Sequence, residues 1–188
     1  MFEKHIVVTV NQRVLSLLAK FSDKEFYERQ IARRIGIGYG SANRALNELY
    51  STGAIRRRQE GKMFFYSVDP YSPIVGEFKK LVNLMLIEPL VEELKDISNR
   101  VVLYGSCAQG MDTSESDVDI FVVSDKKKEV WKAVNNFRFP RGFEEIHIQP
   151  VVSSLIEMLG EKGLEQAFAD EVERGIVLWE RAAGESRV

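Results

Sequence analysis

Hydrophobic residues in the first seventy positions recur first at helical spacing and then at strand spacing. They predict a helix over residues 11–21 and shorter helices over 30–35 and 41–51, with glycines in the turn between the last two. Residues 54–58 and 63–68 are strand-like runs on either side of a polar turn that contains glycine. The first part of the chain is therefore expected to hold three helices and a hairpin.

Short extended segments are expected around these elements. Residues 25–27 form a brief link before the second helix. Residues 6–10 are β-prone and either add an edge strand or lead into the first helix; both readings stay open. Residues 69–73 contain two prolines, so we expect them to separate the hairpin from the second half of the chain.

Apolar residues return to helical spacing after this boundary. A long amphipathic helix is expected from residue 74 to near Pro89, followed by another turn or two over 90–97. Its apolar stripe either pairs with a second copy of the chain or docks the two halves together. The pattern does not separate these alternatives.

The rest of the chain alternates strands and helices, which favours a mixed α/β core. Val130, Trp131 and Val134 are expected to face that core, and the lysines at 126–128 form a solvated loop or meet anions. Ile146 and Ile148 are expected on one strand face. The expected order is strand 101–103, a helix from Ser106, strand 117–123, helix 126–136, strand 144–152, helix 153–159 and helical structure over 164–181, including the apolar segment 176–179.

Asp117 and Asp119 open the second of these strands. Because side chains along a strand alternate between faces, both carboxylates are expected on one face while Val118 and Ile120 point into the core. Two like charges at neighbouring positions are costly unless a cation lies between them, and hard divalent ions are commonly held by carboxylates and substrate phosphates. The pair therefore predicts a site for Mg²⁺ or Mn²⁺.

A glycine-serine turn precedes the aspartates. Gly105 lets the backbone approach a ligand closely, and a helix starting at Ser106 offers unpaired N–H groups and a hydroxyl to phosphates. Gly105 and Ser106 are therefore assigned to nucleotide binding.

The spacing of these residues resembles the signature of the minimal nucleotidyltransferases of the DNA polymerase β superfamily. Gly105-Ser106 is followed, after ten residues, by Asp-x-Asp at Asp117 and Asp119. The resemblance implies that both aspartates are catalytic and that an NTP, with ATP expected, binds together with Mg²⁺. The Gly105/Gly110 pair also fits the family, so Gly110 is added to the nucleotide-binding residues. The resemblance also implies nucleotidyl transfer to an acceptor hydroxyl, carried by a protein or by a small molecule.

Active members of that family place a third carboxylate on the next strand, and this chain departs from the pattern there. Glu145, His147 and Gln149 occupy alternate positions of the expected strand. Glu145 would serve in one register, and His147 is a candidate neutral ligand or general base. Glu145 and His147 are therefore further catalytic candidates. Without a third carboxylate the domain would sense a nucleotide rather than transfer it.

The order and lengths of the elements over residues 11–70 resemble the winged helix-turn-helix family, close to the ArsR-like regulators. The resemblance implies that the third helix enters the major groove of double-stranded DNA while the hairpin contacts phosphates. Repressors of this kind commonly pair through a helix after the wing, so a homodimer is expected. The candidate DNA contacts are Tyr39, Ser41, Asn43, Arg44, Asn47, Arg56, Arg57, Arg58 and Lys62.

Charge divides the chain in the same place. Residues 1–70 contain 12 Lys+Arg and 7 Asp+Glu, a net charge of +5, whereas residues 71–188 contain 14 and 21, a net charge of −7. A basic first part is typical of a nucleic-acid partner, and the acidic remainder indicates a separate role.

Cysteine content and hydropathy exclude other classes. Cys107 is the single cysteine, so an internal disulfide and a Cys-rich zinc site are excluded, and we expect it to be a packing residue rather than a nucleophile. The longest apolar stretches, such as 81–86, fall short of the roughly 18 residues of a membrane helix. The start of the chain also lacks a secretory pattern. A cytoplasmic protein without a membrane partner is expected.

Together these features predict an α+β protein in three parts. Residues 1–70 form a winged helix-turn-helix, residues 71–98 a linker or dimerisation segment, and residues 99–188 a mixed α/β nucleotidyltransferase domain. The expected function is a DNA-binding transcriptional regulator that binds Mg-NTP and transfers a nucleotidyl group. The alternative is a catalytically degraded, nucleotide-sensing regulator. A purely structural scaffold does not explain two acids beside a glycine-serine turn.

Overall fold

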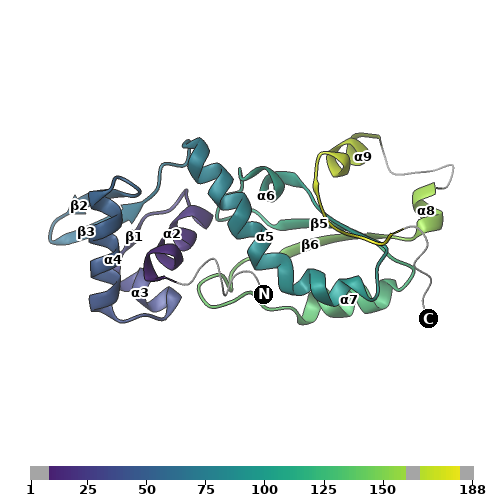
Figure 1. Ribbon diagram of the computed structural model, residues 1–188, viewed down its shortest axis with the longest axis horizontal. Coiled ribbons are helices and arrows are strands. Elements are labelled where there is room, and N and C mark those ends of the chain that lie inside the picture. Colours follow the sequence, from purple (N-terminus) through teal and green to yellow (C-terminus); the bar gives the residue numbers. More distant parts are fainter. Residues whose placement is uncertain (1–8, 160–165, 183–188) are drawn as a thin grey trace.

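The computed structural model describes residues 9–159 and 166–182 of the 188-residue chain. The expected β-prone segment at 6–10 lies outside the described residues except for Thr9 and Val10. These two residues cap and begin a helix, because the Thr9 hydroxyl accepts from the backbone N–H of Gln12 and the Gln12 side-chain oxygen accepts from the backbone N–H of Thr9. Figure 1 shows a helical part with a hairpin at one end, a sheet at the other and one long helix between them.

From Thr9 on, the first part contains three helices and a small sheet in the predicted order. Gly36 ends the second helix in the left-handed conformation, with φ of 66°, which a glycine adopts without strain. The strands pair antiparallel in the order β1-β3-β2. The elements are α2 (Val10–Lys20), β1 (Phe26–Tyr27), α3 (Glu28–Ile35), α4 (Tyr39–Ser51), β2 (Arg56–Glu60) and β3 (Met63–Ser67).

The long helix α5 (Pro73–Lys95) contradicts one expectation, because it continues through Pro89. An interior proline costs about 3 kcal/mol through its missing N–H and its ring clash. The apolar residues on both sides of it, including Leu86, Leu90 and Leu94, are at most 5 % exposed. Burying each of them contributes about 1.5–3 kcal/mol, so tertiary packing outweighs the local cost.

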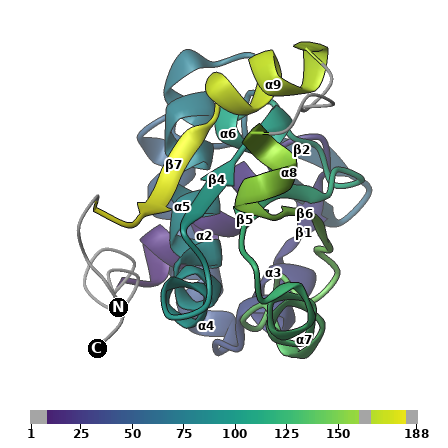
Figure 2. The same ribbon diagram turned by 90° about the vertical axis from the view of Figure 1, so that its right-hand side faces the viewer.

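The second part is a four-stranded sheet with strand order β6-β5-β4-β7. Strands β5 and β6 are parallel, and β4 is antiparallel to both of its neighbours. Viewed from the sheet end, the strands lie side by side (Figure 2). The elements are β4 (Arg100–Leu103), α6 (Gly105–Gln109), β5 (Val118–Val123), α7 (Lys127–Asn136), β6 (Ile148–Ser153), α8 (Leu155–Leu159), α9 (Gln166–Glu173) and β7 (Ile176–Glu180).

Three expectations for this part were wrong. Residues 176–179 are not helical but belong to edge strand β7, which pairs with β4. Strand β6 begins at Ile148, so residues 144–147 precede it. Trp131 is 45 % exposed, because the face of α7 that packs inward carries Val130 and Val134, one helical turn apart.

The two faces of the sheet have separate cores. Val118, Ile120 and Val122 of β5 belong to a cluster that also contains buried residues of α2 and α5, so one core joins both ends of the molecule. Phe121 and Val123 face the other side, where Val172 of α9 packs. The predicted α+β fold class is confirmed. Among the described residues no helix is both long and apolar enough to span a membrane.

Candidate functional site

The two predicted aspartates lie where β5 begins. Asp117 is exposed and immediately precedes the strand, and Asp119 is its second residue and partly buried. Val118 and Ile120 are buried in the core below, so both carboxylates are on the opposite face, the one that α9 covers further along.

The glycine-serine turn lies directly against Asp119. Gly105 has φ of 68°, and a Cβ at this position would lie 2.7 Å from the Asp119 Oδ2 atom. The adjacent Tyr104 N–H donates to the Asp119 carbonyl at 3.1 Å. Only glycine fits so close to this carboxylate in this conformation, and the turn therefore brings its backbone beside the acid.

Burial and neighbouring charges act on this pair. Burial first, and then the charges of Asp117 and Glu171, raise the pKa of Asp119. Burial together with Asp119 and Glu171 raises the pKa of Tyr104 to about 12. The site is therefore a place of accumulated negative charge, which a cation would relieve.

The residues present fit one divalent cation better than two. Asp117 and Asp119 offer hard oxygen ligands, and Mg²⁺ is commonly held by one or two carboxylates plus phosphates and water. Among the described residues no group of three or more His, Cys, Asp or Glu is arranged to hold a metal ion.

The residue that pairs with Asp119 across the sheet carries an amide rather than a carboxylate. Gln149 is the register partner of Asp119, and the His147 carbonyl accepts from the Val118 N–H at 2.8 Å. Gln149 and His147 are both exposed beside the aspartates' strand. Glu145 lies in the turn before β6, and its carboxylate pairs with Arg34 of α3 at 2.6 Å. The structure thus brings Gln149 and His147 beside β5 and holds Glu145 against the helical part.

Glu171 of α9 was missed by sequence reasoning. Phe168 packs edge-on against Tyr104 and Phe121, with ring centroids 5.5 and 5.7 Å apart, and Val172 is buried in the same cluster. Glu171 lies between these positions on α9, and its charge acts on Asp119. The four-residue spacing of Phe168 and Val172 could have indicated a helix with an apolar face. Only the packing shows that this face covers Tyr104 and Phe121, beside the aspartates.

Gly110 and Cys107 have packing roles. A Cβ on Gly110, which has φ of 70°, would lie 2.3 Å from the Gly76 carbonyl of α5. Gly110, which was predicted to contact the nucleotide, therefore packs closely against helix α5. Cys107 is fully buried, and burial raises the pKa of its thiol to about 12, as expected for a packing residue.

The predicted DNA contacts of α4 share one exposed face. Ala42, Ala45, Leu46 and Leu49 are buried on the other side of the helix, as predicted. Asn43 donates to Glu28 and accepts from Asn47, both at 3.0 Å, so polar side chains are ordered along this face. The exposed residues are Tyr39, Ser41, Asn43, Arg44 and Asn47.

The hairpin arginines contact groups of the chain itself. Arg56 pairs with Asp69 at 2.6 Å, and Arg58 pairs with Glu25 and Glu60, each at 2.7 Å. Arg57 lies over the Tyr50 ring, 4.0 Å from its centroid. Lys62 is exposed in the turn. Because these ion pairs are at the surface, Arg56 and Arg58 can exchange their carboxylate partners for other anions at little cost in free energy.

Residues 84–173 match the nucleotidyltransferase domain family. The matched segment begins within α5 and ends with α9, so it contains the glycine-serine turn and both aspartates.

Two solved structures are similar to parts of the chain. Reduced HlyU from Vibrio cholerae is 22% identical over 39% of this chain and 75% of its own, with a TM-score of 0.34. A protein described as a nucleotidyltransferase from Sulfolobus solfataricus is 19% identical over 56% of this chain and 87% of its own, with a TM-score of 0.36.

Proposed function

We propose that this protein is a DNA-binding regulator whose nucleotidyltransferase domain binds a nucleoside triphosphate with a divalent cation. The observation that carries the proposal is the Asp119 carboxylate resting on the Gly105 backbone, with Asp117 beside it, inside the matched family segment. Asp117 and Asp119 would hold Mg²⁺ or Mn²⁺, and Gly105 and Ser106 would bind phosphate oxygens. A bound cation would neutralise the triphosphate and polarise its phosphorus.

The DNA-binding part of the proposal rests on the exposed face of α4 and the basic hairpin. The residue types on that face, Asn and Arg above all, are those that read base edges, and the hairpin arginines suit phosphates. Residues 1–70 carry the positive share of the chain's charge.

Gln149 favours nucleotide sensing over transfer. In the two-metal mechanism both the attacking and the leaving oxygen need a cation, and an amide beside Asp119 contributes no negative charge for a second one. Transfer to an acceptor hydroxyl, with His147 as the base, is the second candidate because His147, the residue just before β6, lies beside the start of β5, where its carbonyl accepts from the Val118 N–H. The acceptor would be a protein or a small molecule.

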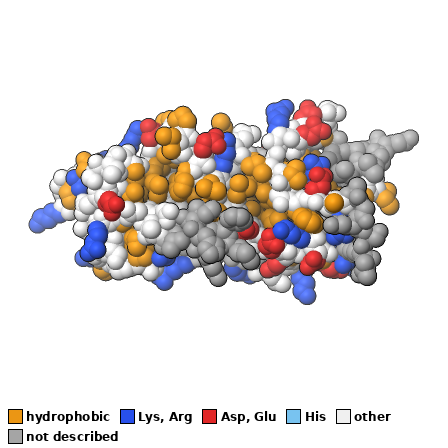
Figure 3. Space-filling model, in the orientation of Figure 1, with side chains coloured by type: hydrophobic (Ala, Val, Ile, Leu, Met, Phe, Trp, Pro, Cys, Tyr) orange, Lys and Arg blue, Asp and Glu red, His pale blue; other side chains and the backbone are white. Residues whose placement is uncertain are grey.

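A homodimer through α5 is part of the proposal. Hydrophobic side chains gather along the middle of one face of the molecule (Figure 3). A groove of about 470 Å³ between α5 and β7 is lined by Leu81, Leu84, Val91 and Leu178. Light scattering of the full chain tests this: a dimer supports it, and a monomer at high micromolar concentration contradicts it.

The decisive experiment incubates the full chain with Mg²⁺ and each labelled NTP, and measures bound nucleotide and released pyrophosphate. Binding without release supports sensing, and release supports transfer. Asp117→Asn with Asp119→Asn should abolish either result, whereas Asp125→Asn, an exposed aspartate beyond the far end of β5, should not. Absence of binding for all four nucleotides contradicts the proposed function.

A further inference from the structure

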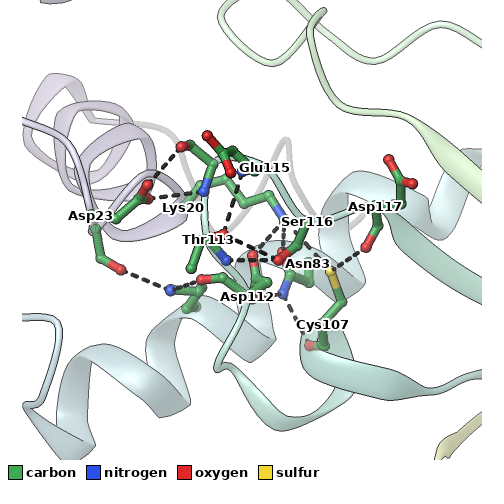
Figure 4. A network of polar contacts seen from close by, with 12 residues as sticks. Lys20, Asp23, Asn83, Cys107, Asp112, Thr113, Glu115, Ser116 and Asp117 are labelled. Carbon is green, nitrogen blue, oxygen red and sulfur yellow. Dashed lines mark hydrogen bonds and ion pairs between the residues drawn. The ribbon is translucent and has the colours of Figure 1, made fainter.

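The segment between the glycine-serine turn and the two aspartates is fastened to the helical part by buried polar contacts (Figure 4). Lys20, the last residue of α2, donates from Nζ to Asp112 Oδ2 at 2.7 Å and to Asn83 Oδ1 at 2.8 Å. Asn83 Nδ2 donates to Asp112 Oδ1 at 2.9 Å and to the Cys107 carbonyl at 3.0 Å. We call Lys20, Asn83, Cys107 and Asp112 the buried junction.

Four further hydrogen bonds surround the buried junction, two of them buried and two at the surface. Lys79 Nζ donates to the Ser22 hydroxyl at 2.8 Å and to the Asp112 carbonyl at 2.5 Å. The Ser114 N–H and hydroxyl donate to the two carboxylate oxygens of Asp23 at 2.9 and 2.6 Å. Although burial acts to raise it, these bonds from Ser114 lower the pKa of Asp23, so this tether uses an ionised carboxylate.

The junction reaches the candidate site through Cys107. Its Sγ atom lies 3.7 Å from Lys20 Nζ and 3.4 Å from the Asp117 carbonyl oxygen. Cys107 also belongs to α6, two residues after Gly105. A shift of the Lys20 side chain would therefore act on the glycine-serine turn and on the start of β5 together.

The loop before β6 docks on the helical part as well. Arg141 donates to the Arg33 carbonyl at the end of α3 at 2.9 Å, and Glu145 pairs with Arg34. Strands β5 and β6 are parallel, so their starting ends, with the aspartates and His147, lie at the same edge of the sheet. Both loops that enter this edge are held by the helical part, one by α2 and one by α3.

We propose that Lys20 and Asp23 are positioning residues of the nucleotide site, and that the buried junction couples occupancy of this site to the conformation of the winged-helix part. The proposal rests on the proposed function, because it assigns regulation to the same site. Such coupling is reciprocal: a nucleotide that favours one placement of the 105–119 segment changes DNA affinity by the same factor by which DNA changes nucleotide affinity.

The test is hydrogen exchange on the full chain, first without ligand and then with Mg²⁺ and ATP, GTP, CTP or UTP. The first variant, Lys20→Met with Asp112→Asn, removes both charges of the buried pair, so neither member is left charged without the other. The second, Asp23→Ala, removes an exposed tether and should leave folding intact. Lys95→Met, which breaks an exposed pair with Glu92, is the matched control.

Without ligand, both junction variants should speed exchange of the Thr113 and Ser116 amides, neither of which bonds to a mutated residue, by about tenfold, the scale of one weakened hydrogen bond, while Lys95→Met leaves them unchanged. Unchanged rates for these amides in both junction variants overturn the positioning roles. This result does not depend on any nucleotide.

With nucleotide, the wild-type chain should gain protection in 105–119 and also in α2 and α3, and the junction variants in 105–119 alone. If nucleotide slows exchange of the wild-type chain only in residues 105–119, the proposed coupling is overturned. Equal protection of α2 and α3 in the variants overturns the route through the junction. No protection with any nucleotide contradicts the proposed function and the coupling with it, while the experiment without ligand still decides the positioning roles.

Discussion

Two ion pairs of equal length show how differently the two regions of this molecule use charge. In the buried junction, Lys20 and Asp112 are 2.7 Å apart, with side chains 1% and 0% exposed. On the hairpin, Arg58 and Glu25 are also 2.7 Å apart, with side chains 50% and 39% exposed. Distance is therefore not what distinguishes them. The two pairs differ instead in how far water can reach them.

The difference follows from desolvation. A buried ion must find every partner inside the protein, and Lys20 finds Asp112, Asn83 and the Cys107 sulfur. An exposed arginine is solvated whether or not it is paired, so Arg58 can exchange Glu25 for another anion. The first arrangement suits a fixed joint between two parts, and the second suits a surface that meets a charged partner.

The largest effect is expected at the buried pair. Lys20→Met leaves Asp112 buried without its cation, which should lower the free energy of unfolding by about 3–5 kcal/mol. Urea denaturation monitored by circular dichroism measures the change. Adding Asp112→Asn should recover most of the loss, because neither member of the pair is then left charged without the other. A single variant as stable as the wild type would show that water reaches the pair.

Two glycines with the same backbone conformation sharpen the comparison. Gly105 and Gly53 have φ of 68° and 74°, so an alanine at either costs about 1–2 kcal/mol from the left-handed conformation. At Gly105 the new methyl group would also overlap Asp119 Oδ2, whereas nothing lies within 4 Å at Gly53. Gly105→Ala should therefore be the more destabilising by thermal melting and should also abolish nucleotide binding. Equal losses of stability would contradict the close contact.

Removing the Asp119 charge should stabilise the protein. Folding raises the pKa of this carboxyl above the ordinary 3.8, so the folded state holds the proton more tightly and the carboxyl's contribution to stability is lost as pH rises through the raised pKa. Asp119→Asn should melt at a higher temperature than the wild type at pH 7 without divalent cations, and at the same temperature below the ordinary pKa. An Asp119→Asn variant less stable than the wild type at pH 7 would contradict the inference that burial and neighbouring negative charges destabilise the ionised Asp119 carboxylate.

The smallest effect on stability is expected at the hairpin. Arg58→Ala should leave the melting temperature nearly unchanged, because its ion pairs are exposed. If Arg58 contacts a DNA phosphate, the variant's plot of the logarithm of the DNA-binding constant against the logarithm of salt concentration should be shallower by about one unit of slope. DNA ligands selected from a random library allow the measurement by electrophoretic shift. An unchanged slope would remove Arg58 from the proposed DNA-binding surface.

Local patterns predicted most elements correctly where propensity and packing agree. The buried stripe of α4, the Gly36 turn and the hairpin follow the pattern of residues closely. The failures occur where packing overrides local preference. Pro89 stays inside α5 because its neighbours are buried, and residues 176–179 become a strand because β4 offers an open edge.

The candidate site divides in the same way. The sequence by itself determined that two acids share a strand face after a glycine-serine turn, since strand alternation and residue spacing are local properties. It left the register of the next strand open, and pairing across the sheet decided that Gln149 stands beside Asp119.

Only the tertiary structure decided that Glu171 borders the site, that Glu145 is held by Arg34, and that Lys20 is buried against Asp112, 92 positions away along the chain. Contacts between distant segments depend on how helices and sheets pack, and a buried ion's partners become visible only when that packing is known. This is why a candidate site could be proposed from its residues, while its attachment to the helical part could not.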